Sequence, residues 1–331
     1  VAEGGAAGAG RPRLLWLDMV CASQNLLAGK YAGRKEDTDR LFDSALETTS
    51  EIVLYLAPLV GEWEAPRQPY LRSDRGEPPA GWMRKGPVAI SRAWCNFELS
   101  SAIAEGHRLL VELRPEDEAS LRSLLETETG VVASIVTSVD ANDAQISKTK
   151  DRAFILGRME RAGGFDAVNR LVKGALRDWL SATALGVLRA AEAAEGEPLA
   201  LLDGVGELLR EMGRHAEAEP LYRRALEGYE AALGPTHPDT LMSVNNLANL
   251  LCEMGRRAEA EPLCRRSLEG FEAALGPTHP NTLSSVNNLA ILLMNMGRHA
   301  QAEPLYRRAL EGREAALGPT HPNTLNSVNN L

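Results

Sequence analysis

Apolar residues recur at helical spacing in a pair of segments that repeats along the last part of the chain. In one pair, a first helix is predicted from Thr240 to Met254 and is ended by Gly255. A second helix is predicted from about Arg257 to Leu275, with Pro262 in its first turn, where no helical hydrogen bond would be lost. Their apolar faces consist of Leu241, Val244, Leu247, Ala248, Leu250, Leu251 and Met254, and of Ala260, Leu263, Cys264, Ser267, Leu268 and Phe271.

The repeat has a strict period. The segment Gly-Pro-Thr-His-Pro begins at Gly234, Gly276 and Gly318, so each unit is 42 residues long. Such a period predicts a solenoid, in which each unit covers its neighbour's apolar face and a concave surface is left for a partner. Three helix pairs are recognisable, the first of them degenerate from Leu199 to Met212, and we expect a fragment because the chain starts at Val1 and ends inside a fourth unit.

The spacing of small and large residues in this unit resembles the tetratricopeptide repeat (TPR), with a longer second helix and a longer link. The matching positions are Leu247-Ala248, Gly255, Ala260 and Cys264, and again Leu289-Ala290, Gly297, Ala302 and Tyr306. The long form is similar to the repeats of kinesin light chains, and the resemblance covers about Pro198 to Leu331. It implies an all-α solenoid of helix hairpins whose first helices line a groove.

The resemblance implies that a set of polar side chains projects into this groove. Asparagine amides both donate and accept hydrogen bonds, so they can hold an extended peptide backbone, as asparagines of kinesin light chains help to hold cargo peptides. An alternative is that Asn245, Asn246, Asn287 and Asn288 only tie neighbouring helices together. The expected groove residues are Asn245, Asn249, Asn287 and Asn295, together with Glu207, Glu211 and Glu253.

Basic and histidine residues also recur once per unit. Arg223-Arg224, Arg265-Arg266 and Arg307-Arg308 form a stripe on the second helices, and interleaved glutamates predict a solvated surface there, with no nucleic-acid footprint. The recurring histidines lack the clustered spacing of metal ligands, so we expect them to have a structural role in the links and predict no metal site. They are His237, His279 and His321.

The amino-terminal half has no repeat and alternates apolar runs with amphipathic stretches. The runs Leu14 to Leu17, Ile52 to Leu56 and Leu109 to Leu113 predict strands, and the alternation predicts an α/β domain with a largely parallel sheet. Farther on, Phe165 to Trp179 predicts a helix that closes this domain, and Ala184 to Ala194 predicts a separate helix leading to the array.

Two motifs in this half resemble known families. The segment Trp16 to Gln24, with Asp18 and Cys21, is similar to a signature of heterokaryon-incompatibility domains, which are relatives of the Toll/interleukin-1 receptor (TIR) fold. The segment Ser91 to Leu99 resembles the Ser-x-x-Trp-Cys-x-x-Glu-Leu helix of TIR domains. The resemblance covers about the first 115 residues and implies a flavodoxin-like α/β fold.

The TIR resemblance singles out Glu98. The apolar stripe that contains Cys95 and Leu99 predicts that Glu98 lies off the buried face, beside Trp94 and lining a cleft. In NAD-cleaving TIR domains the glutamate of this helix is catalytic, so Glu98 would stabilise charge on the ribose, Asp18 would assist, and Trp94 would contact NAD. Many TIR-like domains only assemble, and a purely structural role with self-association is the alternative.

Composition sets limits on the function. The chain has 331 residues, 44% of them hydrophobic, and a net charge of −9, which argues against nucleic acid and anionic membranes as partners. The longest apolar run, Ile52 to Val60, is too short to span a bilayer. The four cysteines lie apart in the sequence and favour a reducing, cytoplasmic compartment. We expect domains at 1–182 and 198–331, with a helical linker at 183–197.

No Gly-rich phosphate loop, Cys-x-x-Cys pair or Gly-x-Ser-x-Gly elbow is present in the sequence, so catalysis would rest on Glu98 and no bound cofactor is expected. The leading hypothesis is a scaffold whose TPR array binds peptide segments of partner proteins and is coupled to a TIR-like domain. Two alternatives are a cargo adaptor of a microtubule motor, although the heptad coiled coil of kinesin light chains is absent from this chain, and an NAD glycohydrolase regulated by the array.

Overall fold

The structure is a computed structural model in which the chain divides into two compact units. The first unit comprises residues 1–124 and 130–184, and the second comprises residues 125–129 and 185–331. The structure describes residues 14–16, 51–56, 62–64, 83–85, 93–144 and 152–330.

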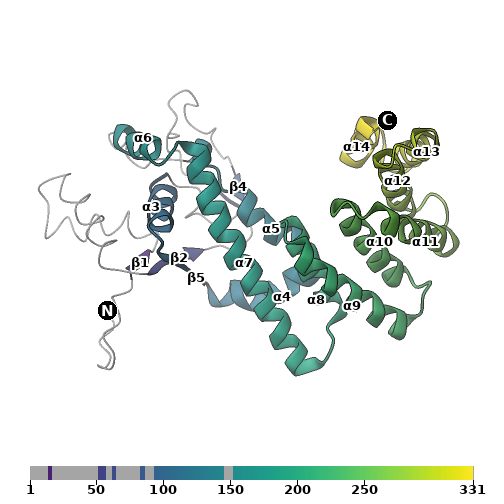
Figure 1. Ribbon diagram of the computed structural model, residues 1–331, viewed down its shortest axis with the longest axis horizontal. Coiled ribbons are helices and arrows are strands. Elements are labelled where there is room, and N and C mark those ends of the chain that lie inside the picture. Colours follow the sequence, from purple (N-terminus) through teal and green to yellow (C-terminus); the bar gives the residue numbers. More distant parts are fainter. Residues whose placement is uncertain are drawn as a thin grey trace, which may run out of the picture. The chain divides into compact units, whose positions relative to one another are not determined.

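Three parallel strands form a sheet in the first unit (Figure 1). Strand β2 (Glu51–Leu56) pairs on one side with β1 (Leu14–Trp16) and on the other with β5 (Arg108–Leu113). The three predicted apolar runs therefore form strands, and their pairing is parallel as predicted. A separate antiparallel pair joins β3 (Glu62–Glu64) to β4 (Met83–Lys85). The resemblance to TIR domains stays a prediction.

The remaining described part of the first unit is mainly helical. Buried side chains such as Val132, Ile135, Ile155 and Met159 form its core together with Leu54 and Leu56 of β2. Helix α6 packs against α3. The helices are α3 (Ala93–Ala104), α4 (Pro115–Thr127), α5 (Thr129–Thr137), a short 3-10 helix (Ala141–Asp143) and α6 (Arg152–Arg161).

A single long helix, α7, spans Phe165–Glu195. The prediction of two helices, ending at Trp179 and restarting at Ala184, is therefore wrong. The intervening residues Leu180, Ser181, Ala182 and Thr183 include neither proline nor glycine, so nothing in the sequence breaks the helix there. Among the described residues, none of the helices combines enough length with enough apolar character to cross a bilayer.

The second unit is an array of helix pairs that stack along the chain (Figure 1). Each helix packs on the next, and α10 also contacts the first helices of the two flanking pairs. The predicted bounds of the second helix at Arg257 and Leu275 are confirmed. The helices are α8 (Leu199–Glu211), α9 (His215–Leu233), α10 (Pro238–Glu253), α11 (Arg257–Leu275), α12 (Pro280–Asn295), α13 (His299–Leu317) and α14 (Pro322–Asn330).

One expectation about the second helices is wrong. Pro262 lies inside α11 rather than in its first turn, because α11 begins at Arg257, and Pro220 and Pro304 are inside α9 and α13 in the same way. A proline at this depth removes one intrahelical hydrogen bond. The helix nevertheless continues, since its buried face, which includes Ala260, Cys264 and Phe271, packs on α10 and α12.

In the link between repeats, a glycine ends one helix, and a histidine and a proline begin the next. Gly276 ends α11 with a φ of 86°, a backbone conformation that residues other than glycine rarely adopt. The next helix begins with Pro280 at its first position, where the missing N–H costs nothing. His279 caps it, because its Nδ1 accepts a hydrogen bond from the Asn281 N–H at 3.2 Å. His237 caps α10 through the Asp239 N–H at the same distance, which confirms the predicted structural role for these two histidines.

A buried threonine fastens each link to the helix that follows it. Thr282 is fully buried and its hydroxyl donates to the Gly276 carbonyl at 2.8 Å. Thr240 and Thr324 donate to the Gly234 and Gly318 carbonyls at 2.8 and 2.9 Å. The bond holds the end of one unit against the start of the next.

We predict that Thr282→Val will lower the free energy of unfolding by about 1 to 2 kcal/mol, because the Gly276 carbonyl loses the hydrogen bond from the buried hydroxyl while the side-chain volume is kept. Thr282→Ser keeps the hydroxyl and should cost clearly less. Urea unfolding of the full chain, followed by circular dichroism, compares the two. A larger loss for serine than for valine would show that packing, and not this hydrogen bond, fixes the link.

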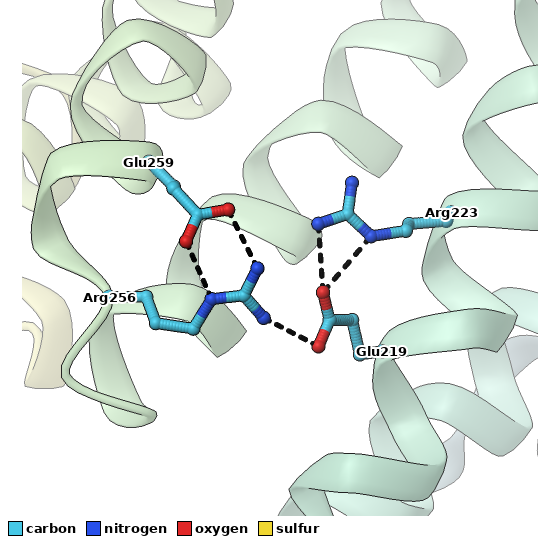
Figure 2. A network of polar contacts seen from close by, with 4 residues as sticks. All are labelled: Glu219, Arg223, Arg256 and Glu259. Carbon is cyan, nitrogen blue, oxygen red and sulfur yellow. Dashed lines mark hydrogen bonds and ion pairs between the residues drawn. The ribbon is translucent and has the colours of Figure 1, made fainter.

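Ion pairs join successive units on the second helices, as Figure 2 shows for four side chains. Arg256, which directly precedes α11, lies between two carboxylates: it donates to Glu219 of the preceding repeat at 2.7 Å and to both oxygens of Glu259 in α11 at 2.7 and 2.6 Å. Arg223 holds the other oxygen of Glu219 at 2.8 Å. The next unit repeats the arrangement, with Arg298 donating to Glu261 at 2.7 Å.

The paired arginines of the second helices also take part in contacts between units. Arg266 bonds Glu230 at 2.6 Å and the Pro235 carbonyl at 3.1 Å, and Arg308 lies 2.5 Å from Glu272. Their neighbours Arg223 and Arg265 bond glutamates one turn earlier in their own helices. The stripe predicted as a solvated surface is thus partly an inter-unit seam.

We predict that Arg256→Ala will lower the Tm more than Arg214→Ala. Arg214 occupies the same position one unit earlier and bonds Glu217 of its own helix at 2.7 Å, so it is a matched control that lacks the Glu219 contact. Because exposed ion pairs are screened by salt, the difference in Tm between the two variants should shrink as salt is added. Equal Tm values at low salt would contradict a stabilising role for the inter-unit pair.

Candidate functional site

A cavity of about 540 Å³ opens along the first helices of successive units. This volume is in the range of ligand sites in proteins. Helix α10 contributes its middle wall, and α8 and α12 contribute the sides. The lining residues are Glu207 and Arg210 of α8, Met242, Asn246, Asn249, Cys252 and Glu253 of α10, and Asn288, Ile291 and Asn295 of α12.

The structure brings together only some of the predicted groove residues. Asn249, Glu253 and Asn295 line the cavity, and so does Glu207, while their role in peptide binding stays a prediction. Glu211 is exposed and is not one of the lining residues.

Asn245 and Asn287, also predicted as groove residues, are not among the residues that line this cavity. Their places are taken by the adjacent Asn246 and Asn288. One residue along a helix rotates a side chain by about 100°, so the adjacent asparagines lie on a different face of the helix. Asn245 instead accepts a hydrogen bond from the Asn288 Nδ2 at 3.1 Å, which ties α10 to α12, and Asn287 is buried with 8% exposure. The alternative of asparagines that tie neighbouring helices therefore holds for the Asn245–Asn288 pair.

One end of the cavity is charged. Arg210 donates to both oxygens of Glu207 at 2.9 and 2.5 Å and to Glu253 of the next unit at 2.5 Å. The buried Tyr222 donates its hydroxyl to Glu207 at 2.6 Å. Burial raises the pKa of Glu207, but the hydrogen bonds from Arg210 and Tyr222 outweigh it and lower the pKa below its usual value. The group is thus ionised near neutral pH and holds Arg210 in place.

Sequence reasoning missed Arg210 and Met242. Arg210 corresponds, one and two units later, to Cys252 and Met294, so no periodic signal marks it. The charge of Glu207 and of Glu253 on either side is the only signal that could have pointed to a paired cation.

A half-buried carboxylate lies next to this site on α8. Burial, together with the negative charges of Glu207 and Asp239, raises the pKa of Asp203 to about 7, against a hydrogen bond from the Ser243 hydroxyl at 3.2 Å. The equivalent positions in the next two units carry Asn245 and Asn287. The first repeat therefore has a titratable group where the next two repeats have a neutral amide.

We predict that Asp203 makes the array less stable as the pH rises. Its proton is held more tightly in the folded chain than at the usual pKa of 3.8, so its favourable contribution is full below about pH 4 and is lost as the pH rises to about 7. The loss is at most about 4 kcal/mol. Asp203→Asn, which restores the residue of the other units, should remove this dependence.

Urea unfolding at pH 4.5 and pH 8 measures this effect. The Asp203→Asn chain should match the native chain at the lower pH and exceed it in stability at the higher one. A native chain that gains as much stability as the variant between the two values would contradict the assignment to Asp203.

The catalytic residues predicted in the first unit have different outcomes. Glu98 is 5% exposed, and Asn96, Leu99 and Ser100 are buried around it, so the expectation that Glu98 lies off the buried face is wrong. Helix α6 packs against α3, which explains why more than one face of α3 is buried. Asp18 and the side chain of Trp94 lie outside the described residues. The catalytic role of Glu98 stays a prediction.

Sequence families match the array. Two tetratricopeptide repeat families match the chain, one over residues 197–256 and the other over residues 240–281 and 282–323. Residues 197–323 are thus tetratricopeptide repeats. No curated protein matches the chain significantly in sequence.

Several solved structures are similar to the chain at low sequence identity. BtubC (BKLC) from P. vanneervenii is 17% identical, with 65% of this chain and 78% of that chain covered and a TM-score of 0.44. A Podosopora anserina protein described as a kinesin light chain with nearly identical TPR-like repeats is 20% identical, with 56% and 86% covered and a TM-score of 0.41. MamA of AMB-1 is 19% identical, with 59% and 95% covered and a TM-score of 0.32.

Proposed function

We propose that the tetratricopeptide repeats bind an extended peptide segment of a partner protein, and that the chain acts as an interaction scaffold. The observation that carries this proposal is the cavity along α8, α10 and α12, which is lined by four asparagine amides and by apolar and charged side chains. Tetratricopeptide repeats generally bind protein or peptide partners, in line with the concave surface that stacked helix pairs leave open.

The amides supply contacts that do not depend on the peptide's side chains. Asn246 and Asn249 lie on α10, and Asn288 and Asn295 lie on α12, so amides from two units face the same space. Each amide offers a donor and an acceptor, which match the N–H and C=O groups of an extended backbone. Peptides of different sequence would share this part of the affinity.

Selectivity would come from the other lining residues. Met242 is 38% exposed and lies in the cavity wall with Ile291, where both would pack against an apolar side chain of the peptide. At the charged end, Arg210 is already engaged by Glu207 and Glu253, which leaves an excess of negative charge. We therefore expect bound peptides to carry an apolar residue followed or preceded by a basic one.

The first unit would carry the assembly or signalling role of the scaffold. We propose a TIR-like assembly or signalling role for it, supported by the Ser91 to Leu99 motif and by the parallel pairing of β1, β2 and β5. Binding in the array would then recruit a partner to a self-associating α/β unit.

We predict that Asn249→Ala combined with Asn295→Ala will weaken peptide binding at least tenfold, because each lost hydrogen bond contributes about 1 kcal/mol. Peptides selected from a random library against the full chain are the ligands, and fluorescence anisotropy measures their Kd. Both residues are in the cavity wall, so the helical circular dichroism spectrum should be unchanged.

Asn281→Ala is the matched control, because Asn281 lies in the link at the start of α12 and not in the cavity wall. It should bind the selected peptides like the native chain. Unchanged binding in the double variant would show that the peptides use another surface, and a failure to select any peptide would contradict the proposed function itself.

A further inference from the structure

One position on the first helices of the repeats is open to the cavity in two repeats and covered in the first. Because the repeat is 42 residues long, Asn246 of α10 and Asn288 of α12 correspond to Gly204 of α8. Asn246 and Asn288 are half-buried and line the cavity. Gly204 is buried and is not one of the lining residues.

The group that covers Gly204 is the backbone of Leu125. A Cβ placed on Gly204 would lie 1.8 Å from the Leu125 carbonyl oxygen and 2.8 Å from the carbonyl carbon, so a side chain at this position cannot coexist with that backbone. The Thr129 hydroxyl donates to the same carbonyl oxygen at 2.9 Å. Residues 125–129 belong to the same compact unit as α8, so this contact lies within the second unit.

The covered position is directly beside the cavity. Glu207, one turn after Gly204 on the same face of α8, lines the cavity. On α10 the corresponding residues, Asn246 and Asn249, both line it. The first repeat thus has one open position where the second repeat has two, because the segment 125–129 lies where the groove would continue.

We propose that the segment 125–129 is an internal occupant of the groove, and that a bound peptide competes with it for the surface of α8. The inference rests on the proposed function, because it names a competitor for the peptide. One helical turn is about 5.4 Å, so a peptide that contacts Glu207 comes within a side chain's length of Gly204. The peptide and the segment therefore cannot both hold this end of the groove.

The place of this segment in the sequence gives the competition a consequence. The residues on both sides of it, 1–124 and 130–184, belong to the first unit. A ligand shifts an equilibrium between two states only by binding one of them more tightly, and competition for a shared surface meets this condition. Release of the segment would change the chain that leads directly into the first unit.

Gly204→Ala tests the proposal, because its methyl group would overlap the Leu125 carbonyl. Without peptide, hydrogen–deuterium exchange of residues 125–129 should be faster in this variant than in the native chain, with α10 to α13 unchanged. Random peptides of about 12 residues are long enough to cross three helices. Those selected against the native chain should bind the variant about tenfold more tightly by fluorescence anisotropy, as expected if the segment leaves the groove free in about one molecule in ten.

Gly130→Ala is the matched control, because a Cβ on Gly130, next to the segment, would meet nothing within 4 Å. It should resemble the native chain in both exchange and Kd. A second measurement needs no variant: adding a selected peptide to the native chain should speed the exchange of residues 125–129.

The outcomes separate this inference from the proposed function. Peptide binding that Gly204→Ala does not tighten relative to Gly130→Ala overturns the inference alone. Exchange of residues 125–129 that stays the same or slows when the native chain binds peptide overturns it as well. A selection that yields no peptide contradicts the proposed function, and the inference fails with it.

Discussion

The rest of the array depends on how one unit is joined to the next. In each link a glycine with positive φ ends the second helix, a histidine and a proline begin the next helix, and a buried threonine hydroxyl bonds back to the glycine carbonyl. These groups restrict the backbone conformation between Gly276 and Thr282. Because the same residues recur every 42 positions, the same step recurs, and the units stack in a regular way.

This regular step determines which side chains share the cavity. Once α10 and α12 are placed by the links, the asparagines at equivalent positions face the same space, and the ion pairs of Arg256 and Arg298 hold the second helices in register on the outer side. Variation between repeats then gives each part of the wall its own chemistry. Arg210 and Cys252 occupy the same position in two successive repeats and supply a cation and a thiol to the wall.

Much of the array could be predicted from periodicity alone, because its helices are ended by glycine and their apolar stripes are complete. The groove face could be predicted only in part: Asn245 and Asn246 both flank the stripe of α10, and the angle between repeats decides which of them faces the cavity. The burial of Glu98 depends on a second helix, α6, packed against α3, which no pattern within one helix reveals. For α7 a break was predicted, although no residue in the sequence would cause one, and the structure has one continuous helix.

The central claim is that the cavity along the first helices of the repeats holds an extended peptide. Hydrogen–deuterium exchange of the full chain, with and without a peptide selected from a random library, tests it most directly. The account predicts slower exchange in α10 and α12 on binding, with α9, α11 and α13 unchanged. Slower exchange confined to the second helices, or to the first unit, would contradict it.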